Sequence, residues 1–325
     1  MTDAPAHVAA VIFNPIKVDL VALRETVTAE ASAAGWGETV WFETSVDDVG
    51  QKATKQALDK NVDLIIAAGG DGTVRAVAEA IRGSGVPLAL LPSGTGNLLA
   101  RNLKLTLDDM PGSVTAAFTG EDRPIDLALI DIERADKSRD RHVFVVMAGM
   151  GLDAKMIKNT DDDLKEKAGW IAYVSAVVKS LRDPNELHLR LRLNDGPVKR
   201  ATVHTLIIGN CGSLPGNILL LPDAVVDDGL LDLLLMRPGS ALGWLRVWGK
   251  VAWVNVVLRR TKAGRTRVGA QNDGDLRYET GTNFVARLSR PAEIELDGDP
   301  FGKTTAFKTW IEPGALVVRL PKDTA

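Results

Sequence analysis

Two apolar segments that each end in a glycine-rich turn constrain the fold of this chain more than any other feature. The first, Asp63 to Gly72, reads DLIIAAGGDG, and the second, Pro92 to Asn97, reads PSGTGN after the apolar run VPLALL. A buried strand, a glycine turn and a helix in succession form the repeating unit of a parallel α/β sheet. Glycines let backbone N–H groups approach a ligand closely, and the following helix presents its first N–H groups to a phosphate. The two turns therefore predict a phosphate-binding edge.

Neither turn fits the common nucleotide-binding fingerprints. Arg75 stands where the dinucleotide fingerprint requires its third glycine, and no Gly-Lys-Ser/Thr occurs in the chain. Asp71, between the glycines, would repel a phosphate. It makes chemical sense if it acts through a metal ion or accepts a proton from an incoming hydroxyl. The alternative is that Asp71 only caps the helix that follows it.

Short strands and helices alternate in the first part of the chain. This alternation predicts a parallel sheet with helices on both faces, and ligands of such sheets bind beyond the carboxyl ends of the strands. Asn14, Thr44, the 69–73 turn and the 92–97 turn all fall on that edge. The predicted strands are 7–13, 38–43 and 62–68, and the predicted helices are 19–34, 46–59 and 73–83.

The pattern changes near residue 125, where short alternating or apolar runs become frequent. Many strands at short spacing favour a sandwich or a barrel. Helical patterns interrupt them near 164–181 and 240–260, and the charged segment 133–141 is predicted to be a hairpin loop. The predicted strands are 125–132, 142–149, 186–194, 201–209, 230–236, 264–270, 283–289, 292–296, 305–311 and 315–320.

Charge and cysteine content exclude several classes of protein. The formal net charge is −3 and no basic block occurs, which argues against a nucleic-acid partner. The single cysteine, Cys211, rules out an internal disulfide framework and indicates a reducing compartment. A Cys–His nucleophile pair is an alternative, but Cys211 is expected to be a small core residue. No signal peptide or membrane-spanning run is found, so we expect a cytoplasmic protein.

The motif GGDGT at 69–73, followed by PLALLPSGTGNLLAR, resembles the diacylglycerol kinase and sphingosine kinase family. This family is the lipid-kinase branch of the superfamily that also contains the NAD kinases, and the resemblance covers nearly all of the chain. It implies an α/β + β fold. An N-terminal doubly wound parallel-sheet nucleotide-binding domain would span 1–124, and a C-terminal β-sandwich-like domain 125–306. Residues 307–325 would return to the first domain.

The resemblance also implies an ATP site on the predicted sheet edge. Asp71 is the first candidate for catalysis, because transfer of a γ-phosphoryl group requires Mg²⁺ to neutralise charge and a group to accept a proton. The residues matching the family's ATP contacts are Asn14, Thr44, Gly69, Gly70, Gly72, Thr73, Ser93, Gly94, Thr95, Gly96 and Asn97.

Two further aspartates match positions with roles in the family. Asp153, in MAGMGLDAKM, corresponds to the residue that helps to hold the lipid head group in sphingosine kinases, although it could equally start a helix. Asp299, in IELDGDPFG, replaces the family's glutamate that faces the phosphoryl-transfer site, and Asp297 is the fallback. The alternative for LDGDP is a plain hairpin turn.

The segment LPDAVVDDGLLDL resembles a stretch that holds a structural Mg²⁺ in family members. The implied ligands are the Asp228 carboxylate and the carbonyls of Val225 and Leu230. Mixed sets of oxygen ligands suit hard cations. The alternative is an acidic turn before a β-strand.

A lipid kinase without a membrane span must reach its substrate from the bilayer surface. In segment 240–260, Trp253 and the basic residues Arg246, Lys250 and Arg260 fall on one helical face, opposite an apolar face that contains Trp244. Trp and cationic side chains suit a lipid interface. We expect transient contact with the inner face of the membrane there; a core helix with a solvated basic stripe is the alternative. A homodimer is left open.

The leading interpretation is an ATP- and Mg²⁺-dependent lipid kinase that phosphorylates a hydroxyl of diacylglycerol or of a related lipid, such as a sphingoid base or ceramide. An NAD kinase is the enzymatic alternative, although LPSGTGNLLAR departs from the corresponding segment of those enzymes. A non-catalytic sensor of nucleotide or lipid is the third interpretation. Leu98, where diacylglycerol kinases often carry an acid, and Asp299 favour the sensor, whereas Asp71 and the two glycine loops favour an enzyme.

Overall fold

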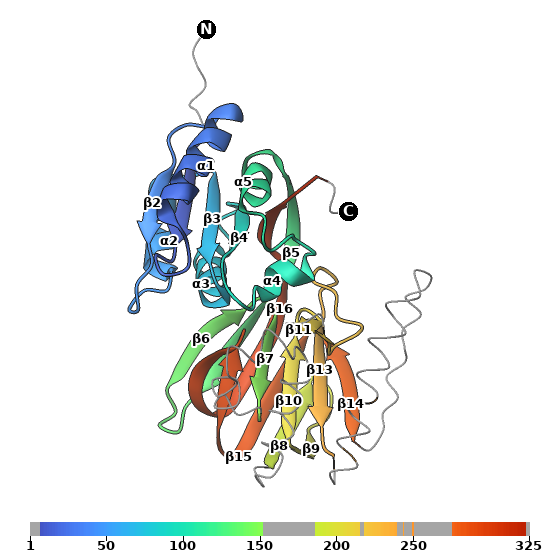
Figure 1. Ribbon diagram of the computed structural model, residues 1–325. Coiled ribbons are helices and arrows are strands. Elements are labelled where there is room, and N and C mark those ends of the chain that lie inside the picture. Colours follow the sequence, from blue (N-terminus) through green and yellow to red (C-terminus); the bar gives the residue numbers. More distant parts are fainter. Residues whose placement is uncertain are drawn as a thin grey trace. The chain divides into compact units, whose positions relative to one another are not determined.

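The computed structural model describes residues 7–151, 186–214, 218–238, 243, 249 and 275–322 (Figure 1). The chain divides into two compact units, the first formed by 1–127 and 312–325 and the second by 128–311. It passes from one unit to the other within two strands, β5 (Glu121–Glu133) and β16 (Asp299–Leu320). The predicted strand at 264–270, the helix at 164–181 and nearly all of the helix at 240–260 lie outside the described residues.

The first unit is built on a parallel sheet. Its strands lie in the order β2-β1-β3-β4, and residues near the end of β16 extend it, with Val318 opposite Leu88. Every residue of β1 and β3 is buried, as expected for parallel strands covered on both faces. The bounds are β1 (Ala9–Phe13), β2 (Val40–Glu43), β3 (Leu64–Gly69) and β4 (Leu88–Pro92).

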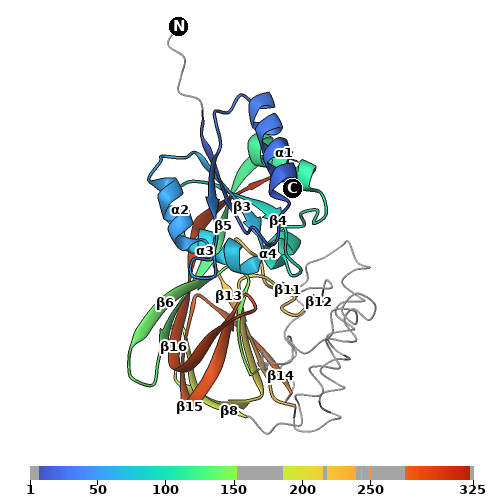
Figure 2. The same cartoon turned by 60° about the vertical axis from the view of Figure 1, so that its left-hand side comes forward.

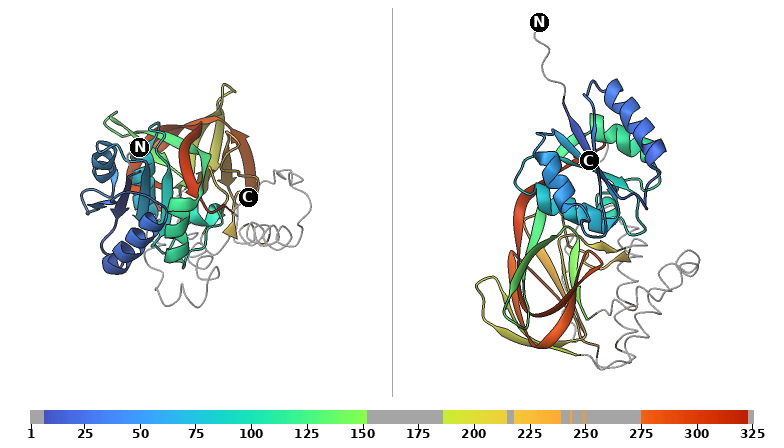
Figure 3. Two further views of the ribbon diagram at one scale, coloured as in Figure 1. Left: turned by 90° about the horizontal axis from the view of Figure 1, so that it is seen from above. Right: turned by 90° about the vertical axis from the view of Figure 1, so that its left-hand side faces the viewer.

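Helices cover both faces of this sheet (Figure 3). On one face α1 (Leu20–Ala33) packs with α5 (Met110–Thr119), and on the other α2 (Gln51–Leu58) packs with α3 (Asp71–Ile81). A fifth helix, α4 (Leu98–Asn102), is a single short turn after the second glycine loop. The first unit is therefore the predicted doubly wound α/β domain.

The predicted start of the second helix, at residue 46, is wrong, because α2 begins at Gln51. The Asp48 carboxylate accepts hydrogen bonds from the backbone N–H groups of Gly50, Lys52 and Ala53. Asp48 therefore lies in a turn before α2 and not within a helix. Gly50 has φ = 141°, which a helix cannot accommodate. Burial opposes ionisation of Asp48, but these three N–H donors hold its pKa below the usual value.

The second unit is a β-sandwich. One layer has the strand order β6-β5-β16-β15-β8-β9 and the other β7-β10-β13-β14. Strand β15 belongs to the first layer through its initial half and pairs with β7 through residues 294–296. The bounds are β6 (Arg139–Phe144), β7 (Met147–Met150), β8 (Leu187–Leu193), β9 (Lys199–Val203), β10 (Thr205–Gly209), β13 (Leu231–Met236), β14 (Leu276–Gly281) and β15 (Asn283–Leu296), with a small ribbon of β11 (Ser213–Leu214) and β12 (Ile218–Leu219).

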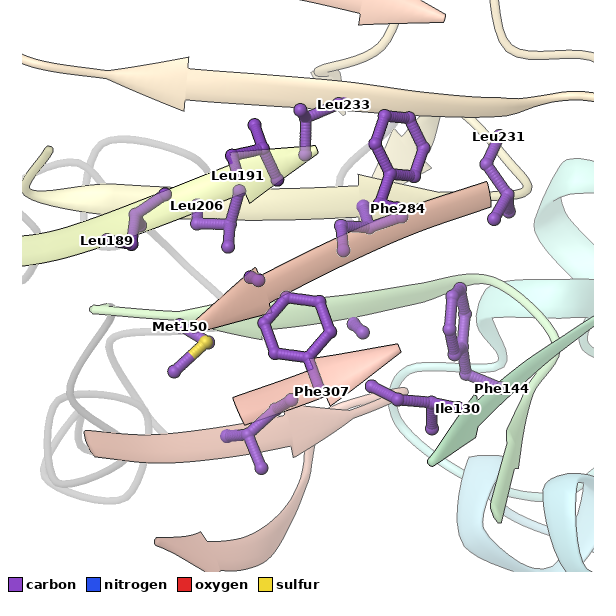
Figure 4. Close-up of a cluster of buried hydrophobic side chains, with 14 of the residues drawn as sticks. Ile130, Phe144, Met150, Leu189, Leu191, Leu206, Leu231, Leu233, Phe284 and Phe307 are labelled. Atoms are coloured by element: carbon purple, nitrogen blue, oxygen red, sulfur yellow. The ribbon is translucent and has the colours of Figure 1, made fainter. Parts of the chain in front are cut away.

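Alternating apolar side chains from both layers fill the sandwich. Leu189 and Leu191 of β8 face Leu206 of β10 and Leu233 of β13, and Phe284 lies among them (Figure 4). In β8 and in the first half of β15 the intervening residues are exposed or half-buried, which is the period-two pattern of a strand with one face on the core. The second unit is thus the β-sandwich-like domain expected from the sequence.

Several strand boundaries differ from the prediction. The predicted strand 201–209 is two strands, because the chain crosses between the layers at His204: β9 pairs with β8, whereas β10 pairs with β7 and β13. The runs 283–289 and 292–296 form one strand, β15, with an irregular register between Arg287 and Ala292. Strand β14 was not predicted. The hairpin at 133–141 is confirmed, with Glu133 opposite Arg139. Among the described residues, no helix is long and apolar enough to span a membrane.

Candidate active site

The carboxyl edge of the parallel sheet gathers the residues predicted for a phosphate site. The N–H of Asn14 donates to the Ala68 carbonyl (2.9 Å), and the N–H of Thr44 donates to the Phe13 carbonyl (2.9 Å). The Asn14 side chain accepts from the N–H of Ile16 and so forms a tight turn after β1. Asn14 therefore lies beside the end of β3, where the first glycine loop begins, and Thr44 lies beside the end of β1.

The two glycine loops are in direct contact. The N–H of Ser93 donates to the Gly69 carbonyl (3.2 Å). A Cβ atom on Gly94 would lie 2.8 Å from the Cα of Gly70, closer than side chains come to backbone atoms in proteins. A Cβ on Gly69 would strike the side chain of Thr73. Packing of one loop on the other therefore accounts for the glycine at 94, and packing against the first turn of α3 accounts for the glycine at 69.

Asp71 connects the first loop to the second. Its Oδ1 accepts a hydrogen bond of 2.5 Å from the N–H of Leu98, at the start of α4, and a Cβ on Gly96 would collide with its carboxylate. Gly70 occupies the N-cap of α3 and has no side chain with which to cap that helix. The Asp71 carboxylate thus binds the N-terminus of the next helix, α4.

The second loop is further held by Asn97 and Arg101. Asn97 has φ = 47°, a left-handed conformation that asparagine tolerates because its amide can bond locally. Its Oδ1 accepts from the N–H of Gly94 (3.0 Å), and its Nδ2 donates to the Gly94 carbonyl (2.6 Å). The Nε of Arg101 donates to the Gly96 carbonyl (2.6 Å). The sequence did not identify Arg101, because an arginine one turn into a helix is usually a surface residue.

The start of α3 is suited to bind an anion. Gly72 and Thr73 lie in the first turn of this helix, where N–H groups have no intrahelical acceptor and the helix dipole is positive. Val74 is the first residue whose N–H bonds back into the helix, to Gly70. Thr95 lies in the second loop beside Gly94. This edge can therefore hold the phosphates of a nucleotide.

A pocket of about 380 Å³ opens next to the second loop, between the N-terminal ends of α1 and α5. The sequence did not predict it. The Asp19 and Asp109 carboxylates on its wall accept from backbone N–H groups and cap these two helices. Residues that line the pocket include Lys17, Leu23, Ser93, Leu107, Met110 and Ser113.

In the second unit, Asp297 and Asp299 belong to the turn between β15 and β16. Asp297 and Gly298 both have positive φ (50° and 87°), and Leu296 pairs with Asp299, as in a type I′ hairpin. The buried Asp297 carboxylate accepts from the N–H groups of Val145 (2.9 Å), Val146 (2.9 Å) and Met147 (3.0 Å). Asp297 therefore has a structural role, and Asp299 begins β16 beside it.

Cys211 is 2% exposed, and its sulfur lies 3.7 Å from the Val145 carbonyl. Burial, reinforced by the negative charge of Asp297, raises the pKa of the thiol far above its usual range. A thiol that stays protonated is a poor nucleophile. Cys211 is a core residue, as expected.

The acidic segment before β13 forms a turn in which the N–H of Leu230 donates to Asp228 Oδ1 (3.0 Å). Asp232, at the start of β13, bonds to Thr280, and burial together with the charges of Asp228 and Asp223 raises its pKa to about 6. Within the described ranges no three His, Cys, Asp or Glu side chains gather as ligands of one metal ion.

A cation at this turn would therefore depend on the Asp228 carboxylate together with backbone carbonyls, such as those of Val225 and Leu230. Asp153, Trp253 and the basic residues Arg246, Lys250 and Arg260 lie outside the part of the chain that the structure describes.

Comparison with known proteins agrees with this architecture. Residues 9–130 match the family model of the diacylglycerol kinase catalytic domain, and residues 145–319 match that of the YegS C-terminal NAD kinase β-sandwich-like domain. A catalytic domain of this type followed by such a sandwich defines a phosphotransferase with an alcohol group as acceptor.

Individual relatives extend over almost the whole chain. A protein of Pseudomonas fluorescens named "Probable lipid kinase YegS-like" is 31% identical over 310 residues, covering 93% of each chain. A protein of Bacillus subtilis named diacylglycerol kinase is 25% identical over 298 residues, covering 90% of this chain and 89% of its own. A crystal structure of a diacylglycerol kinase from Bacillus anthracis has the same fold, with a TM-score of 0.68 at 17% identity over 98% of both chains. The chain belongs to the YegS and diacylglycerol kinase family of lipid kinases.

Proposed function

We propose that this protein transfers the γ-phosphoryl group of ATP, with Mg²⁺, to the hydroxyl of a lipid, and that diacylglycerol is the first substrate to test. The observation that carries the proposal is the closure of the two glycine loops upon each other at the N-terminus of α3. Such an edge binds phosphates through fixed backbone N–H groups, and the family supplies the reaction class.

The residues of the first unit would have distinct roles in binding the nucleotide and in the transfer. Gly72 and Thr73, with Thr95 and Gly96 of the second loop, would bind phosphate oxygens through their N–H groups, while Asn14 and Thr44 would border the nucleotide. Asp71 holds the two glycine loops together through its hydrogen bond with the N–H of Leu98. As a carboxylate at the phosphate-binding edge, it is also the candidate group to accept the hydroxyl proton or to bind Mg²⁺.

Bound Mg²⁺ would neutralise phosphate charge during the transfer. Asp299 remains a proposed contributor to the transfer, and Asp153 a proposed contact of the lipid head group. The set of Asp228, Val225 and Leu230 remains a proposed structural Mg²⁺ site. The names of the relatives support a glycerolipid over NAD as acceptor, and activity on diacylglycerol would give the protein a role in phospholipid biosynthesis.

The experiment that tests the proposal is transfer of labelled phosphate from [γ-³²P]ATP in the presence of Mg²⁺. Diacylglycerol, monoacylglycerol, sphingosine and ceramide in detergent micelles are the acceptors, with NAD in parallel. We expect label in diacylglycerol, and its loss when EDTA replaces Mg²⁺. Label only in NAD would make the protein an NAD kinase. ATP binding without any transfer would make it a sensor.

Two substitutions of Asp71 separate its chemical role from its positioning role. In Asp71→Asn the amide oxygen still accepts from Leu98, so we expect an unchanged melting temperature but a loss of kcat of at least about 100-fold. In Asp71→Ala the Leu98 N–H loses its acceptor, and stability should fall by about 2 kcal/mol as well. If Asp71→Asn retains near-normal kcat, Asp71 acts only by positioning the second loop.

A further inference from the structure

The first layer of the sandwich turns a strongly basic face away from the core. In β9, β8 and β15, Arg200 lies opposite Arg190, and Arg190 lies opposite Arg287. Three arginines thus stand side by side on adjacent strands, and all three are exposed. Like charges directly opposite each other in a sheet are destabilising, so this row lowers the stability of the isolated protein.

The positive charge continues across β16 and β6, which lie in the same layer (Figure 2). Trp310 of β16 points to this side, with the guanidinium of Arg141 5.0 Å and the ammonium of Lys308 5.3 Å from its ring centroid. The side chains of Arg141 and Arg287 are 58% and 60% exposed. We define the basic face as Arg139, Arg141, Arg190, Arg192, Arg200, Arg287, Lys308 and Trp310.

On this side of β5, the carboxylates of Asp131 and Glu133 are both already engaged by basic side chains. Asp131 forms a two-fold hydrogen bond with Arg141 (2.7 and 3.0 Å), which lowers its pKa. Glu133 pairs with Arg139 (2.8 Å) and with Lys137 (3.2 Å).

Neither of these two carboxylates forms a close ion pair with the arginine row. Arg287 comes only within 3.9 Å of Glu133. Within the described residues Arg190, Arg192 and Arg200 form no ion pair. A concentration of unneutralised cations on a chain with net charge −3 therefore indicates an anionic partner.

We propose that the basic face binds the surface of a membrane that contains anionic phospholipids. The cations project from one face of a sheet and match a plane of many separate negative charges, which a bilayer surface provides. Trp310 adds an amphipathic ring of the kind that partitions into the head-group region. The choice of this partner rests on the proposed lipid kinase function, since a bilayer contains the substrate.

Electrostatic attraction to an anionic leaflet contributes about fivefold in partitioning for each Arg or Lys near the surface. Replacing the three arginines of the row should therefore reduce vesicle binding on the order of 100-fold. Salt should weaken the binding of the original protein as well, because exposed charges are screened.

The test is co-sedimentation of the full chain, without ATP, with phosphatidylcholine vesicles containing 30 mol% phosphatidylglycerol. The triple variant Arg190→Gln, Arg200→Gln, Arg287→Gln is compared with the matched control Lys52→Gln, Lys55→Gln, Lys60→Gln, which loses the same charge from exposed positions of α2 and the turn that follows it. We expect the arginine variant to lose binding, the lysine variant to keep it, and pure phosphatidylcholine vesicles to bind neither.

Melting temperatures provide the folding control, and the arginine variant should melt no lower than the original protein, since it relieves repulsion. Kinase activity on short-chain diacylglycerol in micelles should survive in this variant while activity on vesicles falls. Equal loss in both triple variants, or tighter binding of duplex DNA than of vesicles, would overturn the proposal. Because vesicle binding and micellar activity are separate measurements, failure of one leaves the other interpretable.

Discussion

At the scale of single residues, both the packing of one loop on the other and the close approach of a phosphate require glycine in the two loops. Gly94 permits the second loop to approach Gly70, and Gly96 permits Asp71 to reach Leu98. Closeness of the backbone to a phosphate would favour the same residue. The packing of one loop on the other is therefore sufficient to require glycine in this motif, even without a bound ligand.

Replacing Gly94 with alanine tests this packing. The new Cβ would lie 2.8 Å from Gly70 Cα and 3.2 Å from Asn97 Oδ1, so the loops must separate. We expect affinity for a non-hydrolysable ATP analogue to fall at least tenfold in calorimetric titration, because the phosphate donors lose their alignment. Gly149→Ala is the control, since a Cβ there meets nothing within 4 Å. Equal affinities for the two variants would contradict the packing argument.

At the scale of elements, the hairpin between β15 and β16 holds the strand that follows β6. Asp297 bonds through its side chain to the N–H groups of Val145, Val146 and Met147, and its own N–H donates to the Met147 carbonyl. One carboxylate thus satisfies three buried backbone donors. This explains why an aspartate, rather than asparagine, stands at a left-handed turn position.

We expect Asp297→Asn to reduce the free energy of unfolding by about 3 kcal/mol, because the amide nitrogen would face backbone N–H donors. Urea denaturation followed by tryptophan fluorescence measures the loss. Asp299→Asn, two residues along the chain, should leave stability within about 0.5 kcal/mol while lowering kinase activity, if Asp299 contributes to the transfer. A larger loss of stability in Asp299→Asn than in Asp297→Asn would contradict the structural role of Asp297 and the proposed role of Asp299 in the transfer.

At the scale of the whole molecule, stability depends on pH through Asp232. Its folded-state pKa is raised from 3.8 to about 6. The folded protein therefore holds this proton more tightly than the unfolded chain, and the stability it provides below pH 4 is lost as pH rises to about 6. The expected loss is on the order of 1–2 kcal/mol.

Melting temperatures between pH 4.5 and 7 test this dependence. The slope should flatten in Asp232→Asn, in which no carboxyl group titrates at this position. Addition of Mg²⁺ at pH 7 should raise the melting temperature of the original protein if a cation binds near Asp228. An unchanged pH profile in the Asp232 variant would show that another group is responsible.

The sequence was most informative where local chemistry decides structure. The buried strands, the two glycine loops and the β-rich second unit follow from apolar runs and turn residues. Partners distant in sequence could not be predicted: the bond from Asp71 to Leu98, the three donors of Asp297 and the crossing of layers at His204 depend on tertiary packing. The arginine row likewise appears only when strand register is known, because its members come from three strands that are separated in sequence.

One consequence concerns synthesis on the ribosome. The end of β16 pairs with β4 through Val318 and Arg319 and is tied to the same unit by the bond between Arg319 and Asp122. These residues are translated after the entire second unit. Until then β4 presents an open strand edge, which is a site for non-native pairing. The sheet of the first unit can therefore be completed only after the ribosome has synthesised the second unit, which comprises about two hundred residues.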